Sequence, residues 1–200
     1  MHADDKQLEE ATIPNWCNNT VKFTHADTTQ IARVATAFAA EQLMQEFYPC
    51  PTSLNVTAGM DGPKGSPEQL ALEAQEQKNI QEHGFANWYD WQVEMWGTKW
   101  DVGDKNNDCG YVVGDTAIVL SFDSAWSPPI GFYEKMEELG FSVDALYYEP
   151  GMAFCGHYVD GEDAQYEITG NAEWVDNNIP EDINMMFAIA ENMADWEDTE

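Results

Sequence analysis

The sequence predicts an α+β fold in which helices pack on one face of a largely antiparallel sheet. Short segments alternate polar and apolar residues, as half-buried strands do. Apolar stripes with helical spacing follow capping residues, and proline or glycine marks the turns between segments. The expected order is strand, helix, insertion, strand, helix, two or three strands and a final helix. Such an order is typical of helices segregated to one side of an antiparallel sheet.

The first unit is a strand followed by a helix. Residues 20–24 alternate polar and apolar side chains, which predicts a half-buried strand. Asp27 and Gln30 have the spacing of a capping-box pair, so a helix is expected to begin after Asp27. Its apolar stripe consists of Ile31, Val34, Ala35, Phe38, Ala39 and Leu43.

An insertion at about residues 48–110 separates this unit from the rest of the sheet. A loop rich in proline and glycine opens it. Ser66 and Pro67 then have the pattern of an N-cap and first helical residue, and Gly84 that of the residue after the helix. Asn87 is expected to begin a second, short helix. The insertion is rich in tryptophan, with Trp88, Trp91, Trp96 and Trp100.

The second half of the chain supplies the remaining strands. The apolar run at 117–122 predicts a central strand, and Ser127-Pro128 is expected to cap a helix that ends at Gly140. Alternating residues at 141–147 form the next predicted strand. The Pro150-Gly151 turn leads to its antiparallel partner at 152–159.

A weaker strand at 164–169 and one C-terminal helix complete the prediction. Pro180 is expected at the first helical position, followed by an apolar side formed by Ile183, Met186, Phe187, Ala190 and Met193. The predicted organisation is one α+β domain over 14–170 and an acidic C-terminal helical extension over 171–200, packed on that domain.

Five short strings occur together in a fixed order. They are Pro14-Asn15-Trp16-Cys17-Asn18-Asn19, Tyr48-Pro49-Cys50-Pro51, Trp96-Gly97-Thr98-Lys99-Trp100-Asp101, Trp126-Ser127-Pro128-Pro129 and Tyr148-Glu149-Pro150-Gly151-Met152. Together they resemble the YubB-type ferredoxin-like domain family of phage and plasmid proteins. The resemblance spans roughly residues 14–158 and implies a ferredoxin-like core and a mobile-element origin. It implies no catalytic residues, and residues 160–200 lie outside it.

The charge of the chain constrains its partners. The net charge is −29, and from Glu137 onward there are seventeen Asp and Glu residues but no Lys or Arg. Such a chain attracts basic surfaces and repels nucleic acid and anionic membranes within the Debye length. No signal peptide or apolar membrane segment is recognisable, so we expect the protein in the cytoplasm of the host cell.

Cysteine and histidine offer one possible metal site. Cys155 and His157 lie two apart on a predicted strand and should share a face, where Cys17 and Cys50 could complete a zinc site. The spacing matches no compact zinc module, and reduced, buried thiols are the more common role. We therefore predict no metal and no cofactor. Cys109, the remaining cysteine, has no Cys-x-x-Cys partner.

Catalytic and nucleic-acid-binding motifs do not stand out. The sequence has no Gly-x-Ser-x-Gly elbow and no Walker loop, so a non-enzymatic protein is expected. The tryptophans of the insertion could stack on bases, but a single-strand binder also needs a basic groove. Lys99 is the only nearby cation, which favours a satellite aromatic core or a patch that faces a partner.

The leading hypothesis is a DNA mimic that inhibits a host defence or DNA-handling protein by occupying its basic nucleic-acid-binding surface. Spread evenly, the charge amounts to one per roughly 330 Å², against about 110 Å² for duplex DNA, so the charges must gather on about a third of the surface. The expected partner-binding residues are Glu162, Asp163, Glu173, Asp176, Glu181, Asp182, Glu191, Asp195, Glu197 and Asp198. The alternatives are an acidic protein–protein interaction domain without mimicry, and a metal-dependent enzyme.

Overall fold

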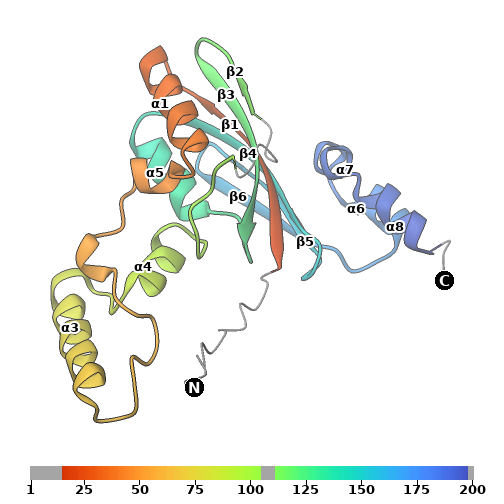
Figure 1. Ribbon diagram of the computed structural model, residues 1–200. Helices are drawn as coiled ribbons and strands as arrows, with labels where there is room; N and C mark the ends of the chain where they lie inside the picture. Colours follow the sequence, from red (N-terminus) through yellow and green to blue (C-terminus); the bar gives the residue numbers. More distant parts are fainter. Residues whose placement is uncertain (1–14, 105–110, 198–200) are drawn as a thin grey trace, which may run out of the picture.

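The computed structural model describes residues 15–104 and 111–197. Within them, six strands form one antiparallel sheet in the order β2-β3-β1-β4-β5-β6 (Figure 1). The strands are β1 (Trp16–Thr24), β2 (Tyr111–Val113), β3 (Ala117–Ala125), β4 (Ser142–Glu149), β5 (Phe154–Val159) and β6 (Glu162–Glu167). The α+β fold class predicted from the sequence is confirmed.

The first four strands have a ferredoxin-like arrangement. The chain runs β1, α1 (Thr28–Ala39), the insertion, the β2-β3 hairpin, α5 (Ile130–Glu138) and β4. β1 lies between β3 and β4 and is antiparallel to both, which gives the β-α-β-β-α-β order of that fold. The β5-β6 hairpin extends the sheet beyond β4, while β2 forms its other edge.

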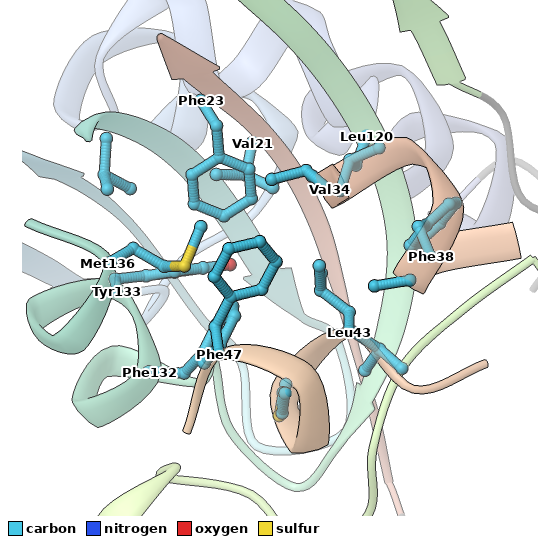
Figure 2. Packing of buried hydrophobic residues seen from close by; sticks show 14 of the residues in the cluster. Val21, Phe23, Val34, Phe38, Leu43, Phe47, Leu120, Phe132, Tyr133 and Met136 are labelled. Atoms are coloured by element: carbon cyan, nitrogen blue, oxygen red, sulfur yellow. The ribbon is translucent and has the colours of Figure 1, made fainter. Parts of the chain in front are cut away.

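One face of the sheet, called here the helix face, carries the main hydrophobic core. Helices α1, α2 (Leu43–Phe47) and α5 cover this face, and β1 directs Val21 and Phe23 into it (Figures 1 and 2). The Phe23 ring makes edge-on contacts with Phe132, Tyr133 and Phe141 at centroid distances of 6.2–6.4 Å. Such aromatic pairs add stability beyond the apolar area that they bury.

Three short helices cover the other face of β4 and β5. They are α6 (Ala172–Asn178), α7 (Glu181–Phe187) and α8 (Ile189–Glu197), called here the C-terminal layer. They enclose a second cluster in which Val175, Ile183 and Ile189 pack with Cys155 of β5. The sequence predicted one helix after Pro180, but Ala188 adopts a left-handed conformation (φ 49°) and separates α7 from α8.

The insertion contains the two helices that were predicted. These are α3 (Pro67–His83) and α4 (Trp88–Met95), with a short 3-10 helix η1 (Thr52–Leu54) in the preceding loop. Ser66 caps α3 by accepting the Gln69 N–H at 3.2 Å, and Gly84 ends it in a left-handed conformation. Asn87 caps α4, as its position predicted. In Figure 1, α3 and α4 lie beside the sheet, beyond one end of the strands.

Two expected caps differ in detail. Asp27 accepts the backbone N–H of Thr29 at 2.9 Å, so the cap is made without the Gln30 side chain. Ser127 does not cap α5, which begins at Ile130 after Pro129. The Ser127 hydroxyl instead donates to the carbonyl of Gly97 at 2.5 Å, because the chain between β3 and α5 packs against the insertion.

The edges of some elements also differ from the prediction. β1 begins at Trp16, ahead of the expected strand at 20–24, and β2 was not predicted. Leu43, which was expected to continue the stripe of α1, begins α2. Across residues 15–104 and 111–197, no helix combines the length and apolar character that crossing a membrane requires.

Candidate functional site

The C-terminal layer presents most of the expected partner-binding residues. All six of its described acids from the predicted set are exposed: Glu173, Asp176, Glu181, Asp182, Glu191 and Asp195. They come from three helices that lie on the same side of the sheet (Figure 1). No Lys or Arg occurs in the sequence after Lys135, so the layer supplies no strong cation to neutralise them.

Asp176 and Glu191 line a groove between α6, α7 and α8. The groove has a volume of about 490 Å³ and a wall of small apolar side chains, with the 68% exposed Met185 at its edge. The Asn184 amide donates to Asp176 Oδ1 at 2.9 Å, and the Asp176 side chain is exposed. An apolar wall beside carboxylates suits the aliphatic stem and charged head of a basic side chain.

His157 lies beneath this layer and connects it to the sheet. Its Nε2 is 2.7 Å from Asp144 Oδ1 on β4, and its Nδ1 is 3.9 Å from Asp182 Oδ2 on α7. His157 on β5 thus contacts one carboxylate on β4 and one on α7.

The two acids predicted on β6 lie on opposite faces of the sheet. Glu162 shares the face of the C-terminal layer, because it pairs with Val159. Asp163 pairs with Tyr158 on the helix face, where it accepts the Tyr147 hydroxyl at 2.7 Å. Asp163 is thus separated from the layer. The Glu197 side chain and Asp198 lie outside the described part of the structure.

The cysteines are not brought together. Cys17 lies on the helix face with Asn19, while Cys155 and His157 share the opposite face, as their spacing predicted. Burial raises the pKa of the Cys50 and Cys155 thiols to about 11 and that of Cys17 higher still, which disfavours the thiolates that bind metals. Among the described residues, no group of three metal-binding side chains is present, and Cys109 falls outside them.

A second candidate region forms where the resemblance strings converge at one end of the sheet. Thr98 and Ala125 exchange two hydrogen bonds of 3.0 Å, which attach the insertion to the end of β3. The backbone N–H of Trp126 donates to the Asn15 carbonyl at 2.8 Å, and Trp126 has a left-handed backbone (φ 68°). Strings that are far apart in the sequence therefore form one structural unit.

The Tyr148-Glu149-Pro150-Gly151-Met152 string closes the neighbouring turn. Glu149 is fully buried, and its carboxylate accepts the backbone N–H of Gly151 at 3.0 Å and that of Met152. A buried carboxylate is stable only when hydrogen bonds compensate for its lost hydration. The role of this string is therefore structural.

Lys99 is the centre of an aromatic group at this end. Its ammonium lies 4.5 Å from the ring centroid of Trp100, 5.5 Å from that of Trp126 and 5.6 Å from that of Tyr89. Within the described residues it forms no ion pair, although the chain is strongly acidic. Cation–π attraction to the rings takes the place of a carboxylate partner. We call Trp88, Tyr89, Lys99, Trp100 and Trp126 the aromatic end.

Two cavities open at the aromatic end, and Trp88 lines both. One has a volume of about 470 Å³, and its lining consists of Thr57, Ala58, Trp88, Tyr89, Lys99 and Trp126. The other has about 410 Å³, and its lining consists of Gln45, Cys50, Pro51, Thr52, Asn55, Trp88, Gln92, Trp100 and Asp101. Trp88 is thus common to both cavities.

Asp101 is the carboxylate at this pair of cavities, and its oxygens are already engaged. They accept the backbone N–H groups of Met44, Gln45 and Val102 at 2.7–2.8 Å. Burial raises the pKa of Asp101 above its ordinary value, while these three hydrogen bonds act in the opposite direction. Asp101 therefore caps α2 and is not a free acceptor for a ligand.

The tryptophans of the insertion divide into two roles. Trp91 and Trp96 are buried, and the Trp96 indole N–H donates to the Tyr48 carbonyl at 2.8 Å. Trp88 and Trp100 line the cavities instead. The sequence indicated a satellite core or a partner-facing patch, but Trp91 and Trp96 belong to the main hydrophobic core. A partner-facing patch stays a prediction. Sequence reasoning missed Tyr89 and Trp126 as cavity residues, because only the folded chain brings their segments together.

Comparisons with known proteins assign no family to this chain. No protein-family model matches the sequence, and no curated protein matches it either, so the resemblance to YubB-type proteins stays a prediction. One solved structure is similar, the crystal structure of a protein api92 from Yersinia pseudotuberculosis, described by the family model DUF1281. The identity is 11% and the TM-score 0.41, over 78% of this chain and 99% of that chain. The fold class is therefore defined by the order and pairing of this protein's own strands and helices.

Proposed function

We propose that this protein is a non-enzymatic inhibitor that uses the C-terminal layer to occupy the basic nucleic-acid-binding surface of another protein. The observation that carries this proposal is the set of exposed carboxylates on α6, α7 and α8, in a stretch of sequence without Lys or Arg. Carboxylates would take the places of phosphates against Lys and Arg of the target.

Electrostatics also favours such a partner over a ligand of like charge. A net charge of −29 steers basic surfaces toward the protein and weakens encounters with nucleic acid. The groove lined by Asp176 and Glu191 gives the layer a place where one basic side chain of the target could insert. The mobile-element resemblance suggests a host defence or DNA-handling protein in the cytoplasm as the target.

The test is competition with DNA. The chain, immobilised at low salt, should retain a basic protein from a lysate of phage- or plasmid-bearing cells, and duplex DNA should release that protein. Triple substitution of Glu173, Glu181 and Glu191 to Gln should weaken retention and reduce its dependence on salt, because fewer charges are paired in the complex.

A matched control removes the same charge elsewhere. Glu68, Glu94 and Glu134 are also exposed but lie on α3, α4 and α5, outside the C-terminal layer. Their triple substitution to Gln should leave retention within about twofold of the unsubstituted chain. Retention that duplex DNA cannot displace, or equal losses in the two triple variants, would rule out mimicry by this layer.

A further inference from the structure

We propose that the aromatic end is a second binding site, which takes a proline-rich segment of a partner protein in the polyproline II conformation. Its two cavities meet at Trp88 and are lined by the rings of Tyr89, Trp100 and Trp126. Proline-rich segments dock into successive slots between aromatic rings, and they lose little entropy because the conformation is preformed. The site is formed by the insertion together with Trp126 after β3, and none of the residues that line it belongs to the C-terminal layer.

Several N–H groups that line the site have no hydrogen-bond acceptor within the described residues. Among the described residues, the indole N–H groups of Trp88, Trp100 and Trp126 donate no hydrogen bond, in contrast to Trp96. The Lys99 ammonium likewise has only ring contacts. The Gln92 side-chain amide also has no partner in this part of the structure. Backbone carbonyls of a polyproline helix are acceptors that need such donors, because proline has no N–H and the helix has no internal hydrogen bonds.

The charge of the chain disfavours an anionic ligand at this site. A nucleotide would stack on the rings, but its phosphates would meet a chain of net charge −29 and one unpaired lysine.

Charge also selects among proline-rich segments. The net charge of −29 attracts a segment flanked by Arg or Lys, whereas Lys99 contacts the carbonyls between the prolines. We therefore assign a basic, proline-rich segment as the occupant. Trp126 is 38% exposed, so its ring is accessible to such a segment.

The test uses a synthetic peptide with two PxxP units and a terminal pair of arginines. Titration of the full chain labelled with ¹⁵N should shift the indole signals of Trp88, Trp100 and Trp126, while that of Trp96 stays in place because its N–H is bonded to Tyr48. Substitution Lys99→Met keeps the stem over the rings but removes the donor, and it should weaken binding roughly tenfold.

The controls separate this site from general charge attraction. Lys78→Met removes an exposed lysine on α3, outside both cavities, and should leave the affinity unchanged. The same peptide with alanine for proline should not bind. The proposal is overturned if the proline peptide leaves all indole signals in place, if the alanine peptide binds equally well, or if Lys99→Met has no effect. It is also overturned if cello-oligosaccharide or adenosine monophosphate, but not the peptide, shifts these signals.

Discussion

The two faces of the sheet are covered in different ways. On the helix face, aromatic rings such as Phe23 of β1 and Phe132 of α5 pack edge-on between the sheet and the helices. On the other face, the short helices of the C-terminal layer pack mainly aliphatic residues such as Ile183 against Cys155. The helix face thus has the larger and more aromatic core. The smaller second cluster lies beneath the helices of the C-terminal layer, which carry the exposed carboxylates.

This difference indicates that the helix face stabilises the whole sheet, whereas the second cluster mainly holds the C-terminal layer in place. Truncation of a ring in the helix face should affect the whole sheet, because the core there connects β1, β3, β4 and α5. Truncation in the second cluster should mainly release α6, α7 and α8, since their apolar contacts are few and short helices are not stable alone.

The largest expected effect is that of Phe132→Ala. Phe132 is fully buried on α5 and its ring meets Phe23 edge-on, so the substitution removes ring contacts and leaves a cavity. We expect a loss of about 3–5 kcal/mol in the free energy of unfolding, measured by denaturant titration. Protection from hydrogen exchange should fall in all strands together. A loss confined to α5 would show that the helix face is not one cooperative core.

Ile183→Ala tests the C-terminal layer. Ile183 is fully buried in α7, and its truncation should cost about 2 kcal/mol, the lower end of the range for such changes, because the layer can rearrange around the gap. Amides of α6, α7 and α8 should exchange faster while those of β1 and β3 keep their protection. Equal acceleration in β1 would contradict the division between the two faces.

The sequence predicted β1 and the starts of three helices well because their signals are local. Alternation in β1 and the caps at Asp27, Ser66 and Asn87 each depend on a few adjacent residues. β2 was missed because three residues form a strand only by pairing with β3. The break at Ala188 was missed because alanine favours helix, and packing in the second cluster overrides that preference.

The sites could be predicted only in part. Sequence charge identified the acids of the C-terminal layer, but it could not separate Glu162 from Asp163, whose faces depend on the register of β5 with β6. The aromatic end brings Tyr89, Lys99 and Trp126 together through hydrogen bonds between the insertion and the end of β3. Such long-range contacts leave no periodic signal in the sequence.

Gly156→Ala tests the helix face at β5, where Gly156 pairs with Tyr147. A Cβ at Gly156 would lie 2.2 Å from the Tyr147 hydroxyl oxygen and 2.7 Å from the carbonyl of Ala164. The Tyr147 ring must therefore move, and its hydrogen bond to Asp163 should be lost. We expect a cost of about 1–3 kcal/mol, measured by thermal unfolding. The double variant Tyr147→Phe/Gly156→Ala should lose less stability than the sum of the losses in the two single variants, because both substitutions disturb the same contact.

The smallest expected effect is a change in the alkylation rate of Cys155, which reports on opening of the C-terminal layer. Burial raises the pKa of Cys155 from 9.0 to about 11, so little thiolate exists at neutral pH and alkylation by iodoacetamide should be slow. Since the folded state holds its proton more tightly, this thiol's contribution to stability is present below pH 9 and is lost as pH rises through 11. Ile183→Ala should accelerate alkylation of Cys155, measured by mass spectrometry, while Cys50 in the insertion keeps its rate. Equal acceleration of both thiols would mean that opening the layer also opens the insertion, and that the two regions do not move independently.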